Sequence, residues 1–291
     1  STTRCGFQRY SYPPGTDSRV MIDLKVPSEY RFDILEAKIN RVSSRRIEGY
    51  SKQQSKKVWS SDVNQDYVIY FVIEFDRDIM NFGGWVNNEI LNEEEIYAES
   101  PEIMGCFAEF DTRRNQVVQV RSGISYVDMD GASNNLNAEI TRPFNWNFDA
   151  IRDSHRQAWN DILSRIYIQS NDKREKQRFY TNMYRSCCRN MFSDVDGRWV
   201  DAAEKTRQFD DPDAVALGCD AFWNTFWNLN QFWNLVTPEW SSRWVKSQLG
   251  MYDANGWLAK GPAGMEYIPV MVAEHEIPLL VSAWQMGIRN Y

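Results

Sequence analysis

The chain is organised around the segment GCDAFWNTFWNLNQFWNLVTPEW, which runs from Gly218 to Trp240. It is followed by DANGWLAKGPAGMEY, from Asp253 to Tyr267, and by MVAEHEIPLLVSAWQMGIR, from Met271 to Arg289. Tryptophans recur here beside asparagine, aspartate and glutamate, a mixture that ordinary core helices do not need. Flat aromatic faces next to amides and carboxylates suit a sugar, because a sugar presents apolar C–H faces together with hydroxyl groups.

The spacing of apolar residues in and around this segment predicts a helical region. We expect helices at about residues 173–189, 220–235, 238–253 and 270–289, each apolar over much of its circumference. This pattern is typical of helices packed in two layers. The loops between them, at 193–199, 210–211 and 256–267, carry more functional groups than plain connections need.

In the N-terminal part of the chain, the apolar residues repeat with a different period. Apolar and polar residues alternate at 19–25, 31–42, 66–75 and 116–127, which is typical of half-buried strands. Turn residues such as Pro13, Pro14 and Gly15 lie between these segments. The pattern predicts an antiparallel β-sandwich. The polar and acidic segment from Phe82 to Glu99 is expected to be a long surface loop.

The change of period marks a boundary. Helical spacing of apolar residues is clear from Phe148 onward, and Asp149 and Asp153 lie where the dipole of a new helix favours negative charge. A shorter helix is expected at about 131–140. We therefore expect an α+β multidomain chain, with part of a sandwich at 1–130, a helical linker at 131–171 and a helical domain at 172–291.

Composition sets the limits on function. The chain has 291 residues, of which 43% are hydrophobic, so it can bury a large core and is long enough for two domains. Its net charge of −7 argues against nucleic acid as a partner, because a phosphate backbone needs a positive surface. No apolar run reaches the roughly 18 residues of a membrane span. The five cysteines lack C-x-x-C spacing, so neither a zinc site nor a disulfide framework is indicated.

Several blocks of the chain resemble, in order and spacing, the signature blocks of glycoside hydrolase family 92. In the second half these blocks are FYTNMYR (179–185), SDVDGR (193–198), FWNTF (222–226), GWL (256–258) and MVAEH (271–275). Upstream, GISYV (123–127), GASNNL (131–136) and AEI (138–140) are similar to the end of that family's N-terminal sandwich. The resemblance covers nearly the whole chain, and several blocks in the right order are far more specific than any single one.

The resemblance implies a calcium-dependent, exo-acting α-mannosidase that inverts the anomeric centre of terminal α-mannosidic bonds. The implied fold is a β-sandwich packed on an (α/α)6 barrel, with the active site between them and with residues 172–291 as the first part of the barrel. The implied partners are α-mannose-containing glycans of N-glycan or mannan type. Such enzymes generally process glycans outside the cytoplasm, so we expect a periplasmic, cell-surface or secreted protein.

The resemblance also implies a catalytic acid. The family's general acid is a glutamate in the loop before the MVAEH block, where Glu266 lies. Its spacing to His275 is one residue off the family pattern, which leaves Glu274 and Glu276 as rivals.

The expected sugar pocket departs from the family pattern. The usual Trp-Asp-Thr-Phe-Arg appears here as Trp223-Asn-Thr-Phe-Trp227, without the carboxylate and the guanidinium. In a continuous helix, Asp220 would replace the carboxylate, because positions i and i+4 share a face. The predicted substrate-binding residues are Asp220, Trp223, Asn224, Trp227, Tyr267, His275 and Glu276.

Other parts of the family pattern are expected outside this chain. The catalytic base and the calcium-coordinating segments should lie beyond Tyr291, and the first part of the sandwich should precede Ser1. We therefore expect an incomplete catalytic site and no intact calcium site, although Asp194, Asp196 and Asp210 could supply a few oxygen ligands.

Two functional classes stay open. The first is an exo-α-mannosidase, and the second is a non-catalytic glycan-binding or scaffold relative of the same fold, favoured by Asn224 and Trp227. A related barrel enzyme acting on α-glucosides is a weaker third.

Structural roles compete with functional ones at single residues. The same helical spacing predicts a core role for Trp233, Trp240, Trp244 and Trp284, and leaves Trp223 and Trp227 open. His155 is expected at the surface or in packing. Asp194 and Asp196 are more simply a turn-forming pair.

Overall fold

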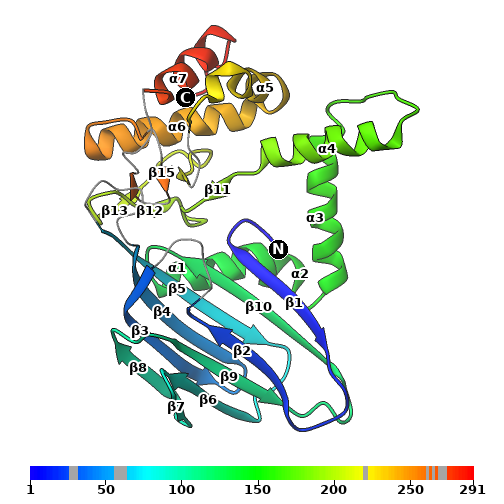
Figure 1. Ribbon diagram of the computed structural model, residues 1–291, viewed down its shortest axis with the longest axis vertical. Helices are drawn as coiled ribbons and strands as arrows, with labels where there is room; N and C mark the ends of the chain where they lie inside the picture. Colours follow the sequence, from blue (N-terminus) through cyan, green and yellow to red (C-terminus); the bar gives the residue numbers. More distant parts are fainter. Residues whose placement is uncertain (26–31, 56–63, 219–221, 260–261, 264–265, 268–273) are drawn as a thin grey trace. The chain divides into compact units, whose positions relative to one another are not determined.

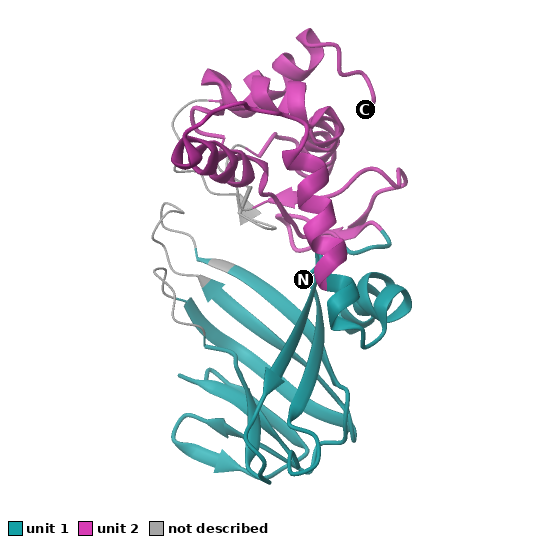
Figure 2. Ribbon diagram, turned by 90° about the vertical axis from the view of Figure 1, so that its right-hand side faces the viewer, with its two compact units in different colours: residues 1–151, 194–196 teal, residues 152–193, 197–291 magenta. Residues whose placement is uncertain are grey.

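In the computed structural model of the protein, the described residues are 1–25, 32–55, 64–218, 222–259, 262–263, 266–267 and 274–291 (Figure 1). The chain forms two compact units (Figure 2). Unit 1 comprises residues 1–151 and 194–196, and unit 2 comprises residues 152–193 and 197–291. The predicted domain limits after residues 130 and 171 stay predictions, and the compact units divide the chain after Ile151.

Unit 1 contains two antiparallel sheets. The six-stranded sheet has the order β1 (Cys5–Ser11), β10 (Val117–Ser125), β5 (Gln65–Phe75), β4 (Arg46–Ser55), β3 (Phe32–Ser43) and β8 (Glu95–Glu99). The four-stranded sheet has the order β2 (Ser18–Asp23), β9 (Met104–Phe110), β6 (Asn81–Val86) and β7 (Glu89–Leu91). The four strands expected from the alternating pattern are thereby confirmed, with ends that shift by at most two residues.

One core joins the two sheets. Ile39 and Ile47 of the larger sheet and Cys106 of the smaller one belong to the same buried cluster. The rings of Phe75 and Phe110 lie 5.0 Å apart and connect β5 to β9 across it. Alternate residues of most strands in the two sheets therefore face a shared apolar interior, which is the arrangement of a β-sandwich.

The loop predicted from Phe82 to Glu99 is wrong, because β6, β7 and β8 occupy most of it. In β8 the buried Ile96 pairs with Ile39, while Glu95, Tyr97 and Glu99 of the same strand are exposed. The strand is at the edge of its sheet, where charged side chains are common because they discourage pairing with other chains. A single buried residue among acids gives too short an alternation to be recognised from sequence.

Helical segments cover the outer face of the larger sheet. They are α1 (Met129–Leu136), a π-helix (Asn137–Thr141), α2 (Arg142–Phe144) and the start of α3 (Phe148–Leu163). Helix α1 packs on β10 and β5, and Leu136 and Ile140 join Phe7 and Val72 in a second buried cluster (Figure 1). The shorter helix expected at about 131–140 is therefore confirmed.

A buried carboxylate connects distant parts of unit 1. Asp194, which is 3% exposed, accepts hydrogen bonds from Ser125 Oγ and Asn135 Nδ2, each at 2.8 Å. The Asn135 side-chain oxygen in turn accepts from the backbone N–H of Val195 at 2.9 Å. Three of the blocks quoted above, GISYV, GASNNL and SDVDGR, therefore meet in one polar cluster.

A second buried acid holds the N-terminus of the chain. Glu139 accepts hydrogen bonds from the Thr2 hydroxyl at 2.6 Å and from the backbone N–H of Arg4 at 2.9 Å, and it forms an ion pair with the Arg4 guanidinium. Burial, and then the charge of Glu139, raises the pKa of the neighbouring Cys5 thiol. Cys5 therefore remains protonated near neutral pH and behaves as a small core residue.

Unit 2 is mainly helical. Its helices are the rest of α3, α4 (Lys173–Cys187), α5 (Leu229–Val236), α6 (Pro238–Asn255), α7 (Glu276–Gln285) and a 3₁₀ turn (Thr225–Trp227). Its main core cluster contains Leu217, Phe222, Trp233, Trp244 and Leu279. No described helix is both long enough and apolar enough to cross a membrane.

The helical domain expected after residue 172 also contains short strands, which the sequence did not predict. Three two-stranded sheets lie in the loops: β11 (Asn190–Met191) with β14 (Leu217–Gly218), β12 (Arg198–Val200) with β13 (Thr206–Gln208), and β15 (Pro262–Ala263) with β16 (Glu266–Tyr267). The β12–β13 hairpin closes around Asp201, which accepts from the N–H groups of Ala203 and Lys205 and from Arg207. Burial by itself raises the pKa of Asp201, but these hydrogen bonds outweigh it and lower the pKa.

Two predicted helices are also corrected. The expected helix at 220–235 begins only at Leu229, because Asn224 adopts a left-handed conformation with φ of 62° and Asn228 is also non-helical. The expected helix at 270–289 is α7, and residues 270–273 lie outside the described part of the chain. Helix α7 ends at Gln285 because Gly287 has φ of 89°, a conformation that glycine adopts readily at helix ends.

We predict that Gly131→Ala destabilises the protein by about 1–3 kcal/mol. A Cβ atom at Gly131 would lie 2.2 Å from Asp194 Oδ2 and 2.6 Å from Ser125 Oγ, both of which the hydrogen bonds hold in place. Urea unfolding measures the change. The matched control is Gly15→Ala, whose Cβ meets only the movable end of the exposed Asp17 within 3 Å, and which we expect to alter stability by less than about 0.5 kcal/mol. Equal effects of the two substitutions would contradict the assigned role of the Asp194 cluster.

Candidate functional site

A short aromatic turn, residues 222–227, is the centre of the candidate site. Phe222 is fully buried and its ring meets Trp244 edge-on, with centroids 5.0 Å apart and planes at 80°. The backbone N–H and the hydroxyl of Thr225 both donate to the Phe222 carbonyl oxygen at 3.1 Å. The turn is therefore anchored at its beginning by packing and by two hydrogen bonds.

The anchored turn exposes two indole rings. Trp223 is 59% exposed and Trp227 is 70% exposed, although both are large apolar side chains. Between them lies Asn224, whose left-handed backbone is tolerated by asparagine better than by most residues. Because both side chains are exposed on a fixed turn, neither tryptophan is a core residue, and a ligand could contact both.

The predicted partners Asp220 and Asn224 do not share a helix face. Asn224 precedes the 3₁₀ turn and is not helical, so the i, i+4 relation does not apply to it. Asp220 itself lies outside the described residues, and its side chain is not placed.

His275 and Glu276 lie next to the aromatic turn. The ring of His275 stacks on Phe226 with centroids 5.2 Å apart and planes at 11°, and Phe226 meets Trp227 edge-on. His275 is the residue that precedes α7, and Glu276 is its first residue and only 2% exposed. A carboxylate is favourable at a helix N-terminus because of the helix dipole. Glu274, by contrast, is exposed.

Glu266 and Tyr267 are placed by their backbone. They form β16, in which Glu266 pairs with Ala263 and Tyr267 with Pro262. The partner strand β15 contacts β14, which ends at Gly218, a few residues before the aromatic turn. The fold thus carries the predicted acid to the neighbourhood of the strand that leads into the aromatic turn. The side chains of both residues lie outside the described part of the structure.

The other tryptophans separate into core and surface. Trp233 and Trp244 are buried and stacked, with ring centroids 6.2 Å apart, so the predicted core role is confirmed for these two residues. Trp240 is half-buried beside the guanidinium of Arg189. The predicted core role is wrong for Trp284, which is 55% exposed near the end of α7, where the packed face of that short helix is formed by Leu279 and Ala283. Trp257, which follows the helix-ending Gly256, is exposed as well.

The structure adds one residue that the sequence did not single out as a site residue. Asn230, in the first turn of α5, is buried, and neither atom of its amide has a hydrogen-bond partner among the described residues. A buried amide without partners is costly, which makes Asn230 a candidate for contact with a ligand or with an undescribed segment. The only sequence signal for it is its place in the Trp-Asn repeat.

Potential metal ligands are scattered in the described residues. No group of three or more histidine, cysteine, aspartate or glutamate side chains there is arranged to hold a metal ion. Asp194 is engaged with Ser125 and Asn135, as described above. His155, on the exposed surface of α3, accepts a hydrogen bond from Trp159 Nε1 at 3.0 Å, which confirms a surface and packing role.

Two family models match the chain. The glycosyl hydrolase family 92 N-terminal domain matches residues 1–125, and the glycosyl hydrolase family 92 catalytic domain matches residues 131–291. No curated protein matches the sequence.

Solved structures share the fold. A family GH92 α-mannosidase from Bacteroides thetaiotaomicron aligns over 100% of this chain and 38% of its own length, with a TM-score of 0.86 and 21% identity. The same enzyme in complex with mannoimidazole aligns with a TM-score of 0.86 and 20% identity, over 100% of this chain and 37% of that one. An inverting family GH92 mannosidase from Bacteroides thetaiotaomicron VPI-5482 aligns over 100% of this chain and 37% of its own, with a TM-score of 0.84 and 19% identity. The chain therefore spans well under half the length of these relatives.

We predict that the two ends of the aromatic turn respond differently to truncation. Trp227→Ala should change stability by less than about 0.5 kcal/mol, because the side chain is mostly exposed. Phe222→Ala should cost about 3–5 kcal/mol, because it leaves a cavity against Trp244. Thermal and urea unfolding of both variants measure this difference. A large loss of stability in Trp227→Ala would show that the ring is packed and is not an open ligand surface.

Proposed function

Because the chain belongs to glycosyl hydrolase family 92, we propose that the full-length protein is a glycoside hydrolase that cleaves α-mannosidic bonds of glycans. The observation that carries the proposal is the consecutive match of both family domains over residues 1–125 and 131–291. The description of similar structures as α-mannosidases, one of them with bound mannoimidazole, supports mannose as the sugar. The exposed tryptophans of the aromatic turn offer the flat apolar surface that a pyranose ring needs.

We further propose exo-action on terminal mannose residues with inversion at the anomeric centre. The resemblance of the sequence blocks supports this, as does the description of one similar structure as an inverting mannosidase. In such a reaction one carboxylic acid protonates the leaving oxygen, while a second carboxylate activates a water molecule on the opposite face of the sugar. The two carboxyl groups are separated by about 6.5–9.5 Å, which leaves room for that water.

Glu266 is our proposal for the acid. It lies on the β15–β16 hairpin, and the contact of β15 with β14 supports a place near the aromatic turn. Trp223 and Trp227 would then form the sugar platform, and we propose Asn224, Tyr267 and His275 as partners for the hydroxyl groups. Glu276, which was also expected to bind sugar, is buried in the described structure and is not given this role. We expect the catalytic base to come from a part of the full-length protein outside this chain.

Calcium dependence is proposed on the family resemblance alone. Calcium prefers six to eight oxygen ligands, and the described residues of this chain contain no acidic cluster of that kind. The residues that could supply single oxygens, such as Asp194, are engaged elsewhere. No step of the mechanism is therefore assigned to a metal. A periplasmic, cell-surface or secreted location is likewise a proposal from the resemblance.

A non-catalytic glycan-binding role is the second candidate. It is favoured by the replacement of a family aspartate and arginine by Asn224 and the exposed Trp227, which removes two charged groups that hold sugar hydroxyls. Such a protein would retain the sugar platform and lose turnover.

Release of aryl alcohol from an aryl α-mannoside by the full-length protein tests the main proposal. We expect hydrolysis of the α-mannoside, no hydrolysis of the matching α-glucoside, and loss of activity with a calcium chelator that added calcium restores. Binding of mannose glycans without any turnover would favour the non-catalytic alternative. Activity that survives the chelator would contradict the calcium dependence only.

We predict that Glu266→Gln in the full-length protein lowers turnover of natural α-mannosides by roughly 10²–10⁴. Activated aryl mannosides, whose leaving groups need less protonation, should lose less. The matched control is Glu175→Gln on the exposed face of α4, which should leave both activities unchanged. If Glu266→Gln retains turnover of natural glycans, the acid must be sought at Glu274 or Glu276.

A further inference from the structure

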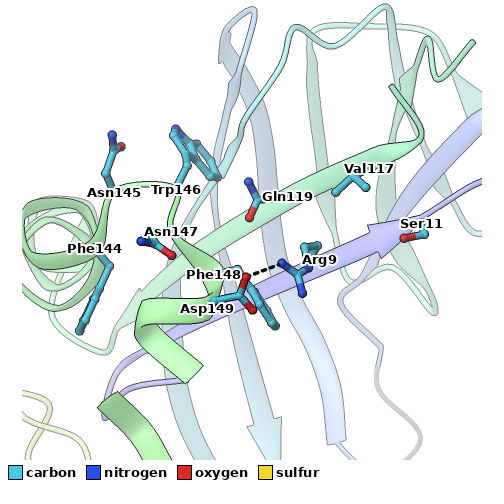
Figure 3. Close-up of a pocket in the computed structure, with 10 residues that line it drawn as sticks. All are labelled: Arg9, Ser11, Val117, Gln119, Phe144, Asn145, Trp146, Asn147, Phe148 and Asp149. Atoms are coloured by element: carbon cyan, nitrogen blue, oxygen red, sulfur yellow. Dashed lines mark hydrogen bonds and ion pairs between the residues drawn. The ribbon is translucent and has the colours of Figure 1, made fainter. Parts of the chain in front are cut away.

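Unit 1 has a pocket that shares no residue with the aromatic turn. Its floor is the outer face of β1 and β10, where Arg9 pairs directly with Gln119 and Ser11 with Val117 (Figure 3). Side chains two residues apart on a strand point to the same face. The helical segments cover this face near Phe7 and leave the Arg9–Ser11 end open.

The wall of the pocket is held rigidly by Arg121. The segment 144–149, between α2 and α3, forms this wall, and its Asn145 has φ of 49° and ψ of −118°, which is strained for a residue other than glycine. The buried Arg121 donates to the Asn145 carbonyl oxygen at 3.2 Å, lies 4.1 Å above the Trp146 ring and is itself paired with Glu74. The strained segment is thus fixed from below, and Trp146 is set in one orientation.

The lining combines aromatic rings with amides. Figure 3 shows Trp146, Gln119, Arg9 and Phe148 following one another across the pocket, with Asn147 beside them. The volume is about 780 Å³, which lies in the range of sites that hold small ligands. One face of each ring is occupied, that of Phe148 by the Arg9 guanidinium at 4.4 Å and that of Trp146 by the Arg121 guanidinium. The remaining ring surface, the amide groups and the edge of the Arg9 guanidinium together match the C–H groups and hydroxyl groups of a sugar.

The charges of the pocket are balanced. Arg9 is 3.3 Å from the Asp149 carboxylate, and Arg121 is paired with Glu74. No net positive charge is therefore left to select an anion, while the guanidinium of Arg9 and the carboxylate of Asp149 can still bind hydroxyl groups at their exposed edges. A neutral ligand with many hydroxyl groups fits this arrangement better than a phosphate or an apolar molecule.

We propose that this pocket is a second carbohydrate site, which binds a mannose unit of a polymeric glycan and holds the chain of sugars to unit 1. The choice of mannose rests on the proposed function, whereas the choice of a neutral saccharide rests on the pocket alone. The site would raise affinity for long glycans and leave small mannosides unaffected, because only a long ligand gains from a second attachment point.

The test compares mannan with a small substrate in the full-length protein. The variant is Arg9→Ala with Gln119→Ala, both of which lie at the open end of the pocket and outside the buried clusters of unit 1. Affinity electrophoresis in gels that contain mannan measures the apparent affinity of each variant for mannan. We expect the double variant to bind mannan about tenfold more weakly than the wild type, because hydrogen bonds to two side chains are lost. The kcat/KM on an aryl α-mannoside should stay within about twofold of the wild-type value.

The matched control is Gln8→Ala, on the same strand as Arg9 but on the opposite face. It should retain wild-type affinity for mannan. Unchanged mannan affinity in the double variant would overturn the proposal, and so would a loss that Gln8→Ala reproduces. Retention by xylan or glucan in place of mannan, with the same dependence on Arg9 and Gln119, would overturn the choice of mannose. A protein that hydrolyses no aryl mannoside but loses mannan affinity in the double variant would support the pocket and refute the proposed catalytic function.

Discussion

The buried carboxylate of Asp194 is the constraint on which much of unit 1 depends. A carboxylate removed from water is costly unless hydrogen bonds replace the water. Here Ser125, at the end of the last strand, and Asn135, in the first helix, supply those bonds, and Asn135 also binds the Ile124 carbonyl oxygen. One acid thus fixes the end of strand β10 and the position of α1. It also holds residues 194–196, which come from a later part of the chain, within unit 1. Gly131 is needed at this point because a larger residue would occupy the volume of the carboxylate.

The same principle shapes the aromatic turn in unit 2. A large buried ring, Phe222, fixes one end of the turn, so the remaining aromatic residues can be exposed without the turn losing its conformation. His275 stacks on Phe226 and links the turn to the start of α7. A preorganised surface of this kind loses little conformational entropy when a ligand binds, which favours specific binding. The departure of Asn224 and Trp227 from the family pattern falls on this surface, so under the proposed function it would bear on sugar preference, whereas the anchoring residues bear on stability.

Both candidate carbohydrate sites follow one design, in which a buried group holds an aromatic side chain at the surface. In the turn the buried group is Phe222, and in the pocket of unit 1 it is Arg121, whose charge is compensated by Glu74. Arg121 also explains how an asparagine remains in a strained backbone conformation at Asn145, since the hydrogen bond to its carbonyl oxygen offsets part of the cost.

The sequence by itself determined the type of many elements, the order of a sheet-rich part and a helical part, and membership of the family. These are local or block-level properties: alternation identified four of the strands, helical spacing identified α3, α4 and α6, and ordered motifs carried the resemblance. The local sequence pattern gave the wrong element where contacts between distant residues determine the secondary structure. The β8 strand is held by one buried residue, Ile96, that pairs with a distant strand, and the helix expected through Asn224 is interrupted by a turn that Phe222 anchors in the core. Whether a tryptophan is buried also depends on neighbours far along the chain, so only the structure separated Trp233 and Trp244 from Trp223, Trp227 and Trp284. Likewise, the sequence around Asp194 predicts only a turn residue. Its role as a buried hydrogen-bond acceptor depends on Ser125 and Asn135, which only the tertiary structure brings next to it.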